Sequence, residues 1–326
     1  ADLSGLRELT LQGWALTQKG VAALASCRQF KKLSSLEIDM SAIGASGGNA
    51  VPALAAATGL RNLEVLNVSD CGLTDGDLRT LAKSNSFPKL TRLGLRHNPA
   101  ATVRGAAAVL ASKNFPQLVH VDFDRAKIDG SEQLPLLLAA PDRPQLELEF
   151  DACVMRRRIN ADEVVVEIEN RDNWHLGLFA DLASAKGADR VTQFVAPSLE
   201  LCGDDVTDLA AGFGPDTLRS LNLTNNPLQN GGAAALGIAF AAFSLRELVL
   251  ADCRIQSAGA AALVKSTLFA ELHTLDLSRN AIGKAGAAAL LKADVPANLK
   301  ELVLTDCRLT ADDKKKLKAK YGPRVT

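Results

Sequence analysis

Aromatic side chains are scarce in this sequence, and no long uninterrupted apolar run is present. Phe, Trp and Tyr account for 4% of the 326 residues, whereas apolar residues of all kinds account for 47%. A core can therefore form, but aliphatic and small side chains must fill it. A membrane-spanning helix needs about 18 or more consecutive apolar residues, so we expect no membrane span.

The sequence also lacks an excess of charge of either sign. Lys and Arg together number 37, as do Asp and Glu, so the formal net charge is zero. A general nucleic-acid-binding protein usually carries a basic excess or a basic stripe, and neither is visible here. We therefore expect a protein partner, and neither a nucleic acid nor a membrane.

Sequence signatures of catalysis and of metal binding are absent as well. The six cysteines form no C-x-x-C pair, which excludes the usual zinc-finger and redox spacings. A phosphate-binding loop, a serine nucleophile elbow and the H-E-x-x-H motif are also missing. His97 and His120 have no third type of metal ligand beside them, so we expect exposed polar histidines. We predict no enzymatic activity, no cofactor, no metal, and free thiols in the cytoplasm.

What the sequence does contain is a periodic pattern. Leu248, Leu250 and Cys253 return 27 residues later as Leu275, Leu277 and Asn280. The template is L-x-x-L-x-L-x-x-(N/C)-x-(L/I), and repetition at such a period is the mark of a solenoid. Copies begin at Leu6, Leu33, Leu63, Leu90, Leu118, Ala196, Leu218, Leu245, Leu272 and Leu299.

This pattern resembles the leucine-rich repeat family over most of the chain. The alternation of Asn226, Cys253, Asn280 and Cys307 is similar to the ribonuclease-inhibitor-like class, and Ala-rich segments such as 259–263 are similar to bacterial members. The resemblance implies an α/β horseshoe solenoid, with parallel strands on the concave face and helices on the convex face. It implies a protein-interaction scaffold, or alternatively a regulator of an enzyme (GTPase-activating or ribonuclease-inhibitor-like) or a structural segment of a larger protein.

The residues support the same architecture independently. The L-x-L alternation predicts a short half-buried strand, and segments such as 259–265 have helical spacing and strong helix formers. One such unit cannot bury both faces, so neighbouring units must stack. Strands stack about 4.8 Å apart and helices about 10 Å apart, so the stack must curve with its strands inside.

Two further features concern the slot after each strand and the ends of the chain. Asn in the slot can satisfy several backbone groups at the inward turn, whereas Cys is small, easily buried and a weak donor. The segment 310–322 predicts a charged capping helix at the C-terminal end. The first repeat begins almost at once, at Leu6, so we expect natural sequence before Ala1 or a neighbour packed on that repeat.

The period fails between about 130 and 191. Residues 145–150 still predict a strand, and a β-hairpin with its turn at 160–162 follows, on which Arg156 and Arg158 face Glu167 and Glu169. Residues 174–190 predict a helix and a return loop. We expect three parts: repeats over 1–140, an irregular part over 141–190, and repeats with the capping helix over 191–326. The irregular part is either a degenerate repeat or a functional insertion.

The residues between the template leucines are expected to point out of the sheet. Arg92 and Arg96 are placed on one strand with their side chains pointing the same way, and Asp122 and Asp124 at the equivalent positions of the next repeat, about 5 Å away. A solvated face explains such charges as well as a binding surface does. One column is expected to contain Thr10, Glu37, Asn67, Gly94, Asp122, Glu200, Asn222, Val249, Asp276 and Val303, and the next Gln12, Asp39, Ser69, Arg96, Asp124, Cys202, Thr224, Ala251, Ser278 and Thr305. The candidate partner-binding residues are Glu37, Asp39, Arg92, Arg96, Asp122 and Asp124, with Arg156 and Arg158 on the hairpin.

Overall fold

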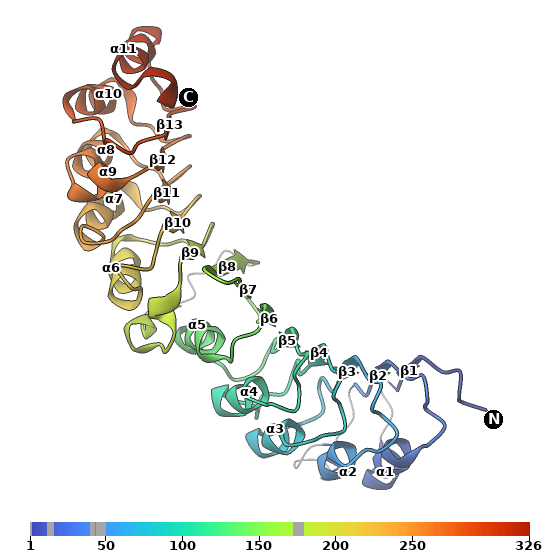
Figure 1. Ribbon diagram of the computed structural model, residues 1–326. Helices are drawn as coiled ribbons and strands as arrows, with labels where there is room; N and C mark the ends of the chain where they lie inside the picture. The colour runs from blue at the N-terminus through green and yellow to red at the C-terminus, as the bar shows by residue number, and fades with distance from the viewer. Residues whose placement is uncertain (1, 12–15, 40–42, 44–49, 172–178) are drawn as a thin grey trace. The chain divides into compact units, whose positions relative to one another are not determined.

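The computed structural model describes residues 2–11, 16–39, 43, 50–171 and 179–326. The chain divides into two compact units, Ala1–Arg156 (unit 1) and Arg157–Thr326 (unit 2). In each unit, short strands follow one another along one side and helices cover the other side (Figure 1). The expectations for Gln12 and for residues 174–178 lie outside the described residues.

Unit 1 repeats one motif, a three- to five-residue strand followed by a loop and a helix. The strands are β1 (Glu8–Thr10), β2 (Ser35–Glu37), β3 (Val65–Asn67), β4 (Arg92–Gly94), β5 (His120–Asp122) and β6 (Gln145–Glu149). The helices are α1 (Gln18–Ser26), α2 (Val51–Ala55), α3 (Asp75–Ala82), α4 (Val103–Leu110) and α5 (Gly130–Ala139). Each strand pairs in parallel with the next.

Unit 2 repeats the same motif after the strand β7 (Cys153–Ile159), which spans the junction of the units. Its strands are β8 (Val164–Asn170), β9 (Gln193–Val195), β10 (Ser220–Asn222), β11 (Glu247–Val249), β12 (Thr274–Asp276) and β13 (Glu301–Val303). Its helices are α6 (Gly203–Gly212), α7 (Gln229–Ala239), α8 (Ser257–Val264), α9 (Thr267–Glu271), α10 (Gly283–Lys292) and α11 (Ala311–Tyr321). The strands from β8 to β13 again pair in parallel.

Residues that lie opposite each other on neighbouring strands are separated by one sequence period. Leu248 on β11 lies opposite Leu221 on β10 and Leu275 on β12, each 27 residues away. The template leucines point inward, and Leu248, Leu250 and Leu275 have no exposed surface. The predicted α/β fold class of stacked strand–helix repeats is therefore confirmed within each unit.

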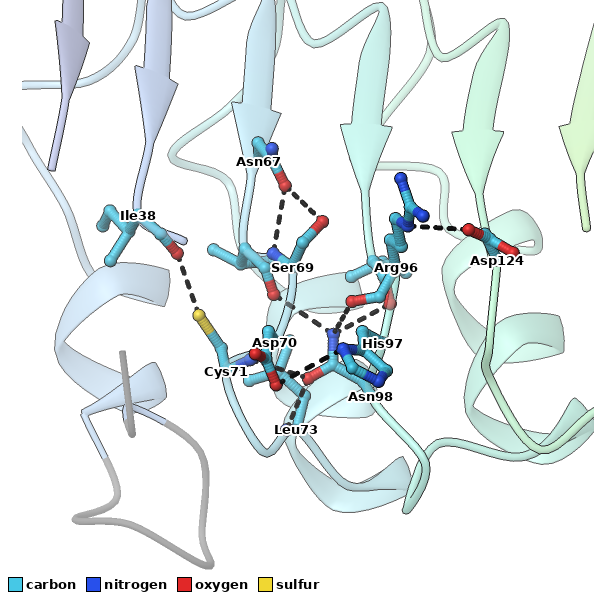
Figure 2. Close-up of polar contacts among 12 residues, drawn as sticks. Ile38, Asn67, Ser69, Asp70, Cys71, Leu73, Arg96, His97, Asn98 and Asp124 are labelled. Atoms are coloured by element: carbon cyan, nitrogen blue, oxygen red, sulfur yellow. Dashed lines mark hydrogen bonds and ion pairs between the residues drawn. The ribbon is translucent and has the colours of Figure 1, made fainter. Parts of the chain in front are cut away.

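The Asn of the slot after the strand supplies the backbone partners that the sequence predicted. Asn98 is fully buried; its Oδ1 accepts from the amides of Cys71 (3.2 Å) and Leu73 (2.9 Å) in the preceding repeat. Its Nδ2 donates to carbonyl oxygens of both repeats, including those of Val68 (3.1 Å) and Leu95 (2.8 Å) (Figure 2). Asn226 and Asn280 make the same contacts in unit 2.

The Cys of the slot has a smaller role, and all six cysteines are free thiols. The Sγ of Cys71 donates to the Ile38 carbonyl at 2.9 Å (Figure 2), and that of Cys253 donates to the Leu223 carbonyl at 3.1 Å. Burial raises the pKa of Cys253 and of Cys307 to about 11. These thiols are therefore structural groups held in their neutral form.

The alternation of Asn and Cys in unit 2 coincides with an alternation of loop conformation. After an Asn slot, the next left-handed residue comes three positions later, whereas after a Cys slot it follows immediately. In the first kind of loop, the amide three positions after Asn donates to the carbonyl of the next Cys, as Gly283 does to Cys307 (3.0 Å). The left-handed residues concerned are Gln229 (φ 55°) and Gly283 (φ 54°) after Asn, and Arg254 (φ 56°) and Arg308 (φ 55°) after Cys.

The repeat pattern persists further into the middle of the chain than its sequence indicated. β6 pairs with β5, with His120 opposite Glu147 and Asp122 opposite Glu149. Residues 145–150 thus form the predicted strand, but the expected failure of the period from residue 130 onward is wrong for this stretch. The template was missed because Gln145 stands where the earlier repeats have Leu.

The repeat expected to begin at Ala196 was placed five residues too late. β9 lies at Gln193–Val195, and Phe194 is opposite Leu221. Leu199 then occupies the slot after the strand, because its amide donates to Asn226 Oδ1 at 2.9 Å. Glu200 and Cys202 consequently lie in the following loop, and their expected places in the sheet columns are wrong. Phe and Ala at two leucine positions caused the error.

The hairpin is confirmed on its unit 2 side, whereas the helix after it is corrected. The loop between β7 and β8 closes with the Asn160 amide donating to the Glu163 carbonyl at 2.9 Å. A helix and a return loop were expected over 174–190; within the described residues 179–190, the chain forms two 3-10 turns, η1 (Leu182–Ser184) and η2 (Ala188–Arg190), and no α-helix. Gly187 between them adopts φ 91°, a left-handed conformation that ends helical winding.

The C-terminal end of unit 2 has the predicted charged helix. Thr310 begins α11 with a capping box in which Asp313 is the partner. After the short 3-10 turn η3 (Gly322–Arg324), Val325 lies beside Leu302 of β13, so the edge of that strand is occupied. None of the helices in the described part of the chain has the length and apolar character that crossing a membrane requires.

Candidate functional site

The candidate site is the side of the unit 1 sheet that carries no helices, called here the sheet face. Alternation along a strand sends the template leucines into the core and the intervening residues to this face. Its members are Glu8, Thr10, Ser35, Glu37, Asp39, Val65, Asn67, Ser69, Arg92, Gly94, Arg96, His120, Asp122, Asp124, Glu147, Glu149 and Asp151. Six of the eight predicted binding residues are among them: Glu37, Asp39, Arg92, Arg96, Asp122 and Asp124.

Arg92 on β4 and Arg96, two residues after that strand, differ in their partners. Arg96 Nε lies 2.6 Å from Asp124 Oδ2 on the adjacent repeat (Figure 2). Arg92 lies opposite His120, and Asp122 lies opposite Gly94. Asp122 and Asp124 were expected to stand opposite Arg92 and Arg96, which is wrong for Asp122. Gly94 lies between the two arginines in the sequence, and it is Gly94 that Asp122 faces. Arg92 is exposed.

Three carboxyl groups gather at the end of β5. The Asp124 amide donates to Asp122 Oδ1 at 2.8 Å, and the Arg125 amide donates to Asp151 Oδ1. Burial and the nearby Asp151 raise the pKa of Asp124 to about 6, although Arg96 opposes this shift. Burial also raises the pKa of Asp122. This corner of the face therefore holds more carboxylates than its one arginine can neutralise.

A second cluster extends along β5 and β6, and sequence reasoning missed most of it. His120 Nδ1 lies 2.8 Å from Glu147 Oε1, and Arg156 Nε lies 2.6 Å from Glu147 Oε2. Burial of Glu147 favours its neutral form, but the hydrogen bonds from Arg156 and His120 outweigh it and lower its pKa. His120 Nε2 also lies 3.7 Å from Glu149 Oε2. His120 was expected to be exposed, which is wrong: its side chain is 14% exposed.

A signal for this cluster was present in the sequence. Residues 145–151 carry acidic side chains exactly one period after the sheet residues of β5, so that Glu147, Glu149 and Asp151 follow His120, Asp122 and Asp124 by 27 positions. Because position 145 is Gln instead of Leu, the template did not identify this repeat, and the correspondence was missed.

At the opposite end of the face, one carboxylate is held by uncharged side chains. Glu37 accepts from Asn67 Nδ2 at 3.1 Å and from Thr10 Oγ1 at 3.4 Å. Asn67 Oδ1 in turn accepts from the Ser69 amide at 3.0 Å. Gly94 leaves room for this network, because a Cβ there would lie 2.6 Å from Asn67 Oδ1. Asp39 lies two residues after Glu37, in the next column of the face.

The two hairpin arginines belong to different units. Arg156 is in unit 1, and its Nε lies 2.6 Å from Glu147 Oε2. Arg158 is in unit 2 and makes the expected cross-strand ion pair, with Nη2 at 3.5 Å from Glu167 Oε2. The outward residues of unit 2 are less charged and include Val195, Val249 and Val303.

The chemistry of the face suits recognition. Carboxylates, arginines and amides hold one another in fixed positions, and these groups can exchange hydrogen bonds and ion pairs with another protein. In the described ranges, no three His, Cys, Asp or Glu side chains are grouped as a metal ion would require.

Comparison with known proteins gives a family and distant structural likenesses. Residues 59–82, 216–237, 241–264 and 272–291 match the family described as Leucine Rich repeat. No curated protein matches the sequence.

Three solved structures are distantly similar to this chain. The Rad7 and Elc1 complex in yeast is 16% identical over 95% of this chain and 70% of that chain, with a TM-score of 0.37. An internalin, InlF, from Listeria monocytogenes is 15% identical over 97% and 85%, with a TM-score of 0.36. The leucine-rich repeat-containing protein LegL7 from Legionella pneumophila is 14% identical over 98% and 88%, with a TM-score of 0.38. These values are too low to transfer a partner or an activity.

Proposed function

Since this chain is a leucine-rich repeat protein, we propose that it is a non-enzymatic scaffold that binds a protein partner through the sheet face of unit 1. The observation that carries this proposal is a sheet that has helices on one side (Figure 1) and fixed polar and charged groups on the other. A regulator of an enzyme would be a special case of such a scaffold, in which the bound partner is the enzyme.

The charges of the face indicate the chemistry of the partner. Eight carboxylates (Glu8, Glu37, Asp39, Asp122, Asp124, Glu147, Glu149 and Asp151) accompany two arginines, Arg92 and Arg96. Arg92 has no ion pair among the described residues. A partner with several Lys or Arg side chains and one carboxylate placed for Arg92 would complement this pattern, and electrostatic complementarity raises both specificity and the association rate.

Affinity capture with charge-reversed variants tests the proposal. The intact chain is immobilised as wild type, as Arg92→Glu, as Arg96→Glu and as Lys292→Glu, the last being an exposed residue at the end of α10. We expect the wild type and Lys292→Glu to capture the same protein from the source cells. Arg92→Glu and Arg96→Glu should capture several-fold less of that protein. Equal capture by all four folded proteins would remove the partner site from this face.

A further inference from the structure

The zero net charge of the chain conceals a strong separation of charge within unit 1. The loops that lead from α1, α2, α3 and α4 to the next strand, residues 27–34, 56–64, 83–91 and 111–119, are called here the loop edge. They contain one acidic residue, Glu64, and seven exposed basic residues: Arg28, Lys31, Lys32, Arg61, Lys83, Lys89 and Lys113. The sheet face, by contrast, carries eight carboxylates. The basic residues are dispersed in the sequence, and only the stacking of repeats brings them to one edge.

Three of these cations line one hollow. Arg28, Lys31 and Arg61 surround a space of about 360 Å³, together with Phe30, Thr58, Gly59 and Asn62. No carboxylate lines it, and none of the three cations has an ion-pair partner among the residues that the structure describes. A concave site with convergent cations and no counter-charge favours an anionic ligand.

The arrangement is poorly explained by the stability of the fold. Cations within the last turn of a helix stabilise its dipole, but Lys31 and Arg61 lie five and six residues after α1 and α2 end at Ser26 and Ala55. Each precedes its template leucine by two positions, so they occupy the same place on adjacent repeats. Like charges at neighbouring positions repel each other, and an anion bound between them would relieve that repulsion.

The floor of the hollow is held in place before any ligand binds. Asn62 Nδ2 donates to the Lys31 carbonyl at 2.9 Å, and Asn62 Oδ1 accepts from Lys89 Nζ at 2.8 Å. The amides of Thr58 and Gly59 both donate to the Ala25 carbonyl, at 3.1 and 3.2 Å. A Cβ on Gly59 would lie 2.3 Å from the Cys27 carbonyl oxygen, so the two loops touch. Such preorganisation reduces the entropy lost on binding.

We propose that the loop edge of unit 1 is a second binding surface, which takes an acidic protein segment seated on Arg28, Lys31 and Arg61. Single-stranded nucleic acid would need exposed aromatic rings for base stacking. The aromatic residues of these loops, Phe30, Phe87 and Phe115, are 5%, 0% and 1% exposed. Guanidinium groups bind carboxylates in a bidentate manner. An extended peptide presents a side chain to one side about every 7 Å, which lies between the ~4.8 Å spacing of the strands and the ~10 Å spacing of the helices that these loops join.

The probe is a fluorescein-labelled peptide of about ten alternating Asp and Glu residues, long enough at ~3.4 Å per residue to cross the four loops. Its affinity is measured by fluorescence anisotropy with the intact chain, at low and at high salt. The variant Arg28→Gln/Lys31→Gln/Arg61→Gln is compared with a control that loses the same charge elsewhere, Lys265→Gln/Lys292→Gln/Lys318→Gln. All six residues are exposed, and circular dichroism verifies that both proteins are folded.

We expect salt-sensitive binding that the loop-edge variant weakens about ten-fold or more, while the control stays within about two-fold of wild type. The single variant Lys31→Gln gives a smaller loss in the same direction if the triple variant does not fold. Arg96→Glu, on the sheet face, leaves this binding unchanged. An equal loss in the control, or no binding by the wild type, overturns the proposal. So does a labelled single-stranded DNA that binds more tightly than the peptide and is released by the same three substitutions.

Discussion

Replacing Asn280 by Ala tests the physical role of the slot after the strand. Asn280 is fully buried, and its Oδ1 accepts from the amides of Cys253 (3.0 Å) and Ile255 (2.9 Å). Its Nδ2 donates to the carbonyls of Leu250 (2.6 Å), Leu277 (3.0 Å) and Ser278 (3.1 Å). The substitution thus removes five hydrogen bonds from a region that solvent does not reach.

Three backbone groups lose their hydrogen-bond partner in the Ala variant, namely the amides of Cys253 and Ile255 and the carbonyl of Leu250. The other two carbonyls keep donors, since Cys307 Sγ donates to Leu277 and the Asp252 amide to Ser278. An unpaired buried polar group costs about 1–3 kcal/mol, so we expect Asn280→Ala to lower the free energy of unfolding by about 3 kcal/mol. Cys253→Ala removes one sulfur atom and a weak donor, and should cost about 1 kcal/mol.

Urea denaturation followed by circular dichroism measures both losses, and the exposed Asn298→Ala serves as a control that should change stability by less than about 0.5 kcal/mol. Amide hydrogen exchange at Cys253 and Ile255 should accelerate in Asn280→Ala and stay unchanged in the control. A cost for Cys253→Ala equal to or above that for Asn280→Ala would refute the hydrogen-bond accounting. Asn280→Asp retains the acceptor but points a carboxylate at three carbonyls; its raised pKa should make this variant lose stability as the pH rises above about 4.

Three other predictions follow from the structure. The pKa of Asp124 is about 6 in the folded chain and about 4 when unfolded, so its contribution favours the fold at low pH and is lost as the pH rises from about 4 to about 6; urea midpoints across this range should show the loss, and Asp124→Asn should abolish it. Cys202 is exposed whereas Cys253 and Cys307 are buried with raised pKa values, so a thiol reagent at neutral pH should label Cys202 in the folded chain and the other two only after unfolding, as mass spectrometry would show. Gly59→Ala should destabilise unit 1 by about 1–3 kcal/mol because the new Cβ would clash with the Cys27 carbonyl, whereas Gly231→Ala, in open space on α7, should stabilise by about 0.5–1 kcal/mol; melting temperatures that move in the same direction for both would contradict this.

The fold was predictable where only one type of side chain fits a given position of the repeat. Leucines at a fixed spacing identify inward strand positions, and Asn280 identifies the turn that needs its amide. The errors occurred where packing tolerates substitution. Phe194 fills a leucine position of β9, and Gln145 stands where the preceding repeat has Leu118. The sequence template therefore misplaced or missed these repeats, although the sheet continues through them.

The candidate site was predictable in its position but only partly in its contacts. Column positions placed Arg96 beside Asp124, because both follow directly from the parallel register. The His120–Glu147–Arg156 cluster depends on a strand that the template missed. The loop edge was invisible for another reason: Arg28, Lys31 and Arg61 are ordinary loop residues in the sequence, and their proximity arises from stacking alone.

The alternating Asn and Cys slots also determine how this chain can be lengthened or shortened. Each Asn completes the turn of the repeat before it, as Asn280 does for Cys253, and the Asn loop itself is completed by the Cys repeat that follows, through Gly283 and Cys307. Excising only the repeat that begins at Leu245, or only the one that begins at Leu272, would place two slots of the same kind side by side, and one turn would lose its donor or acceptor. Excising a neighbouring Asn–Cys pair preserves every such contact. The unit of internal deletion, duplication or recombination in this half of the chain is therefore two repeats, not one.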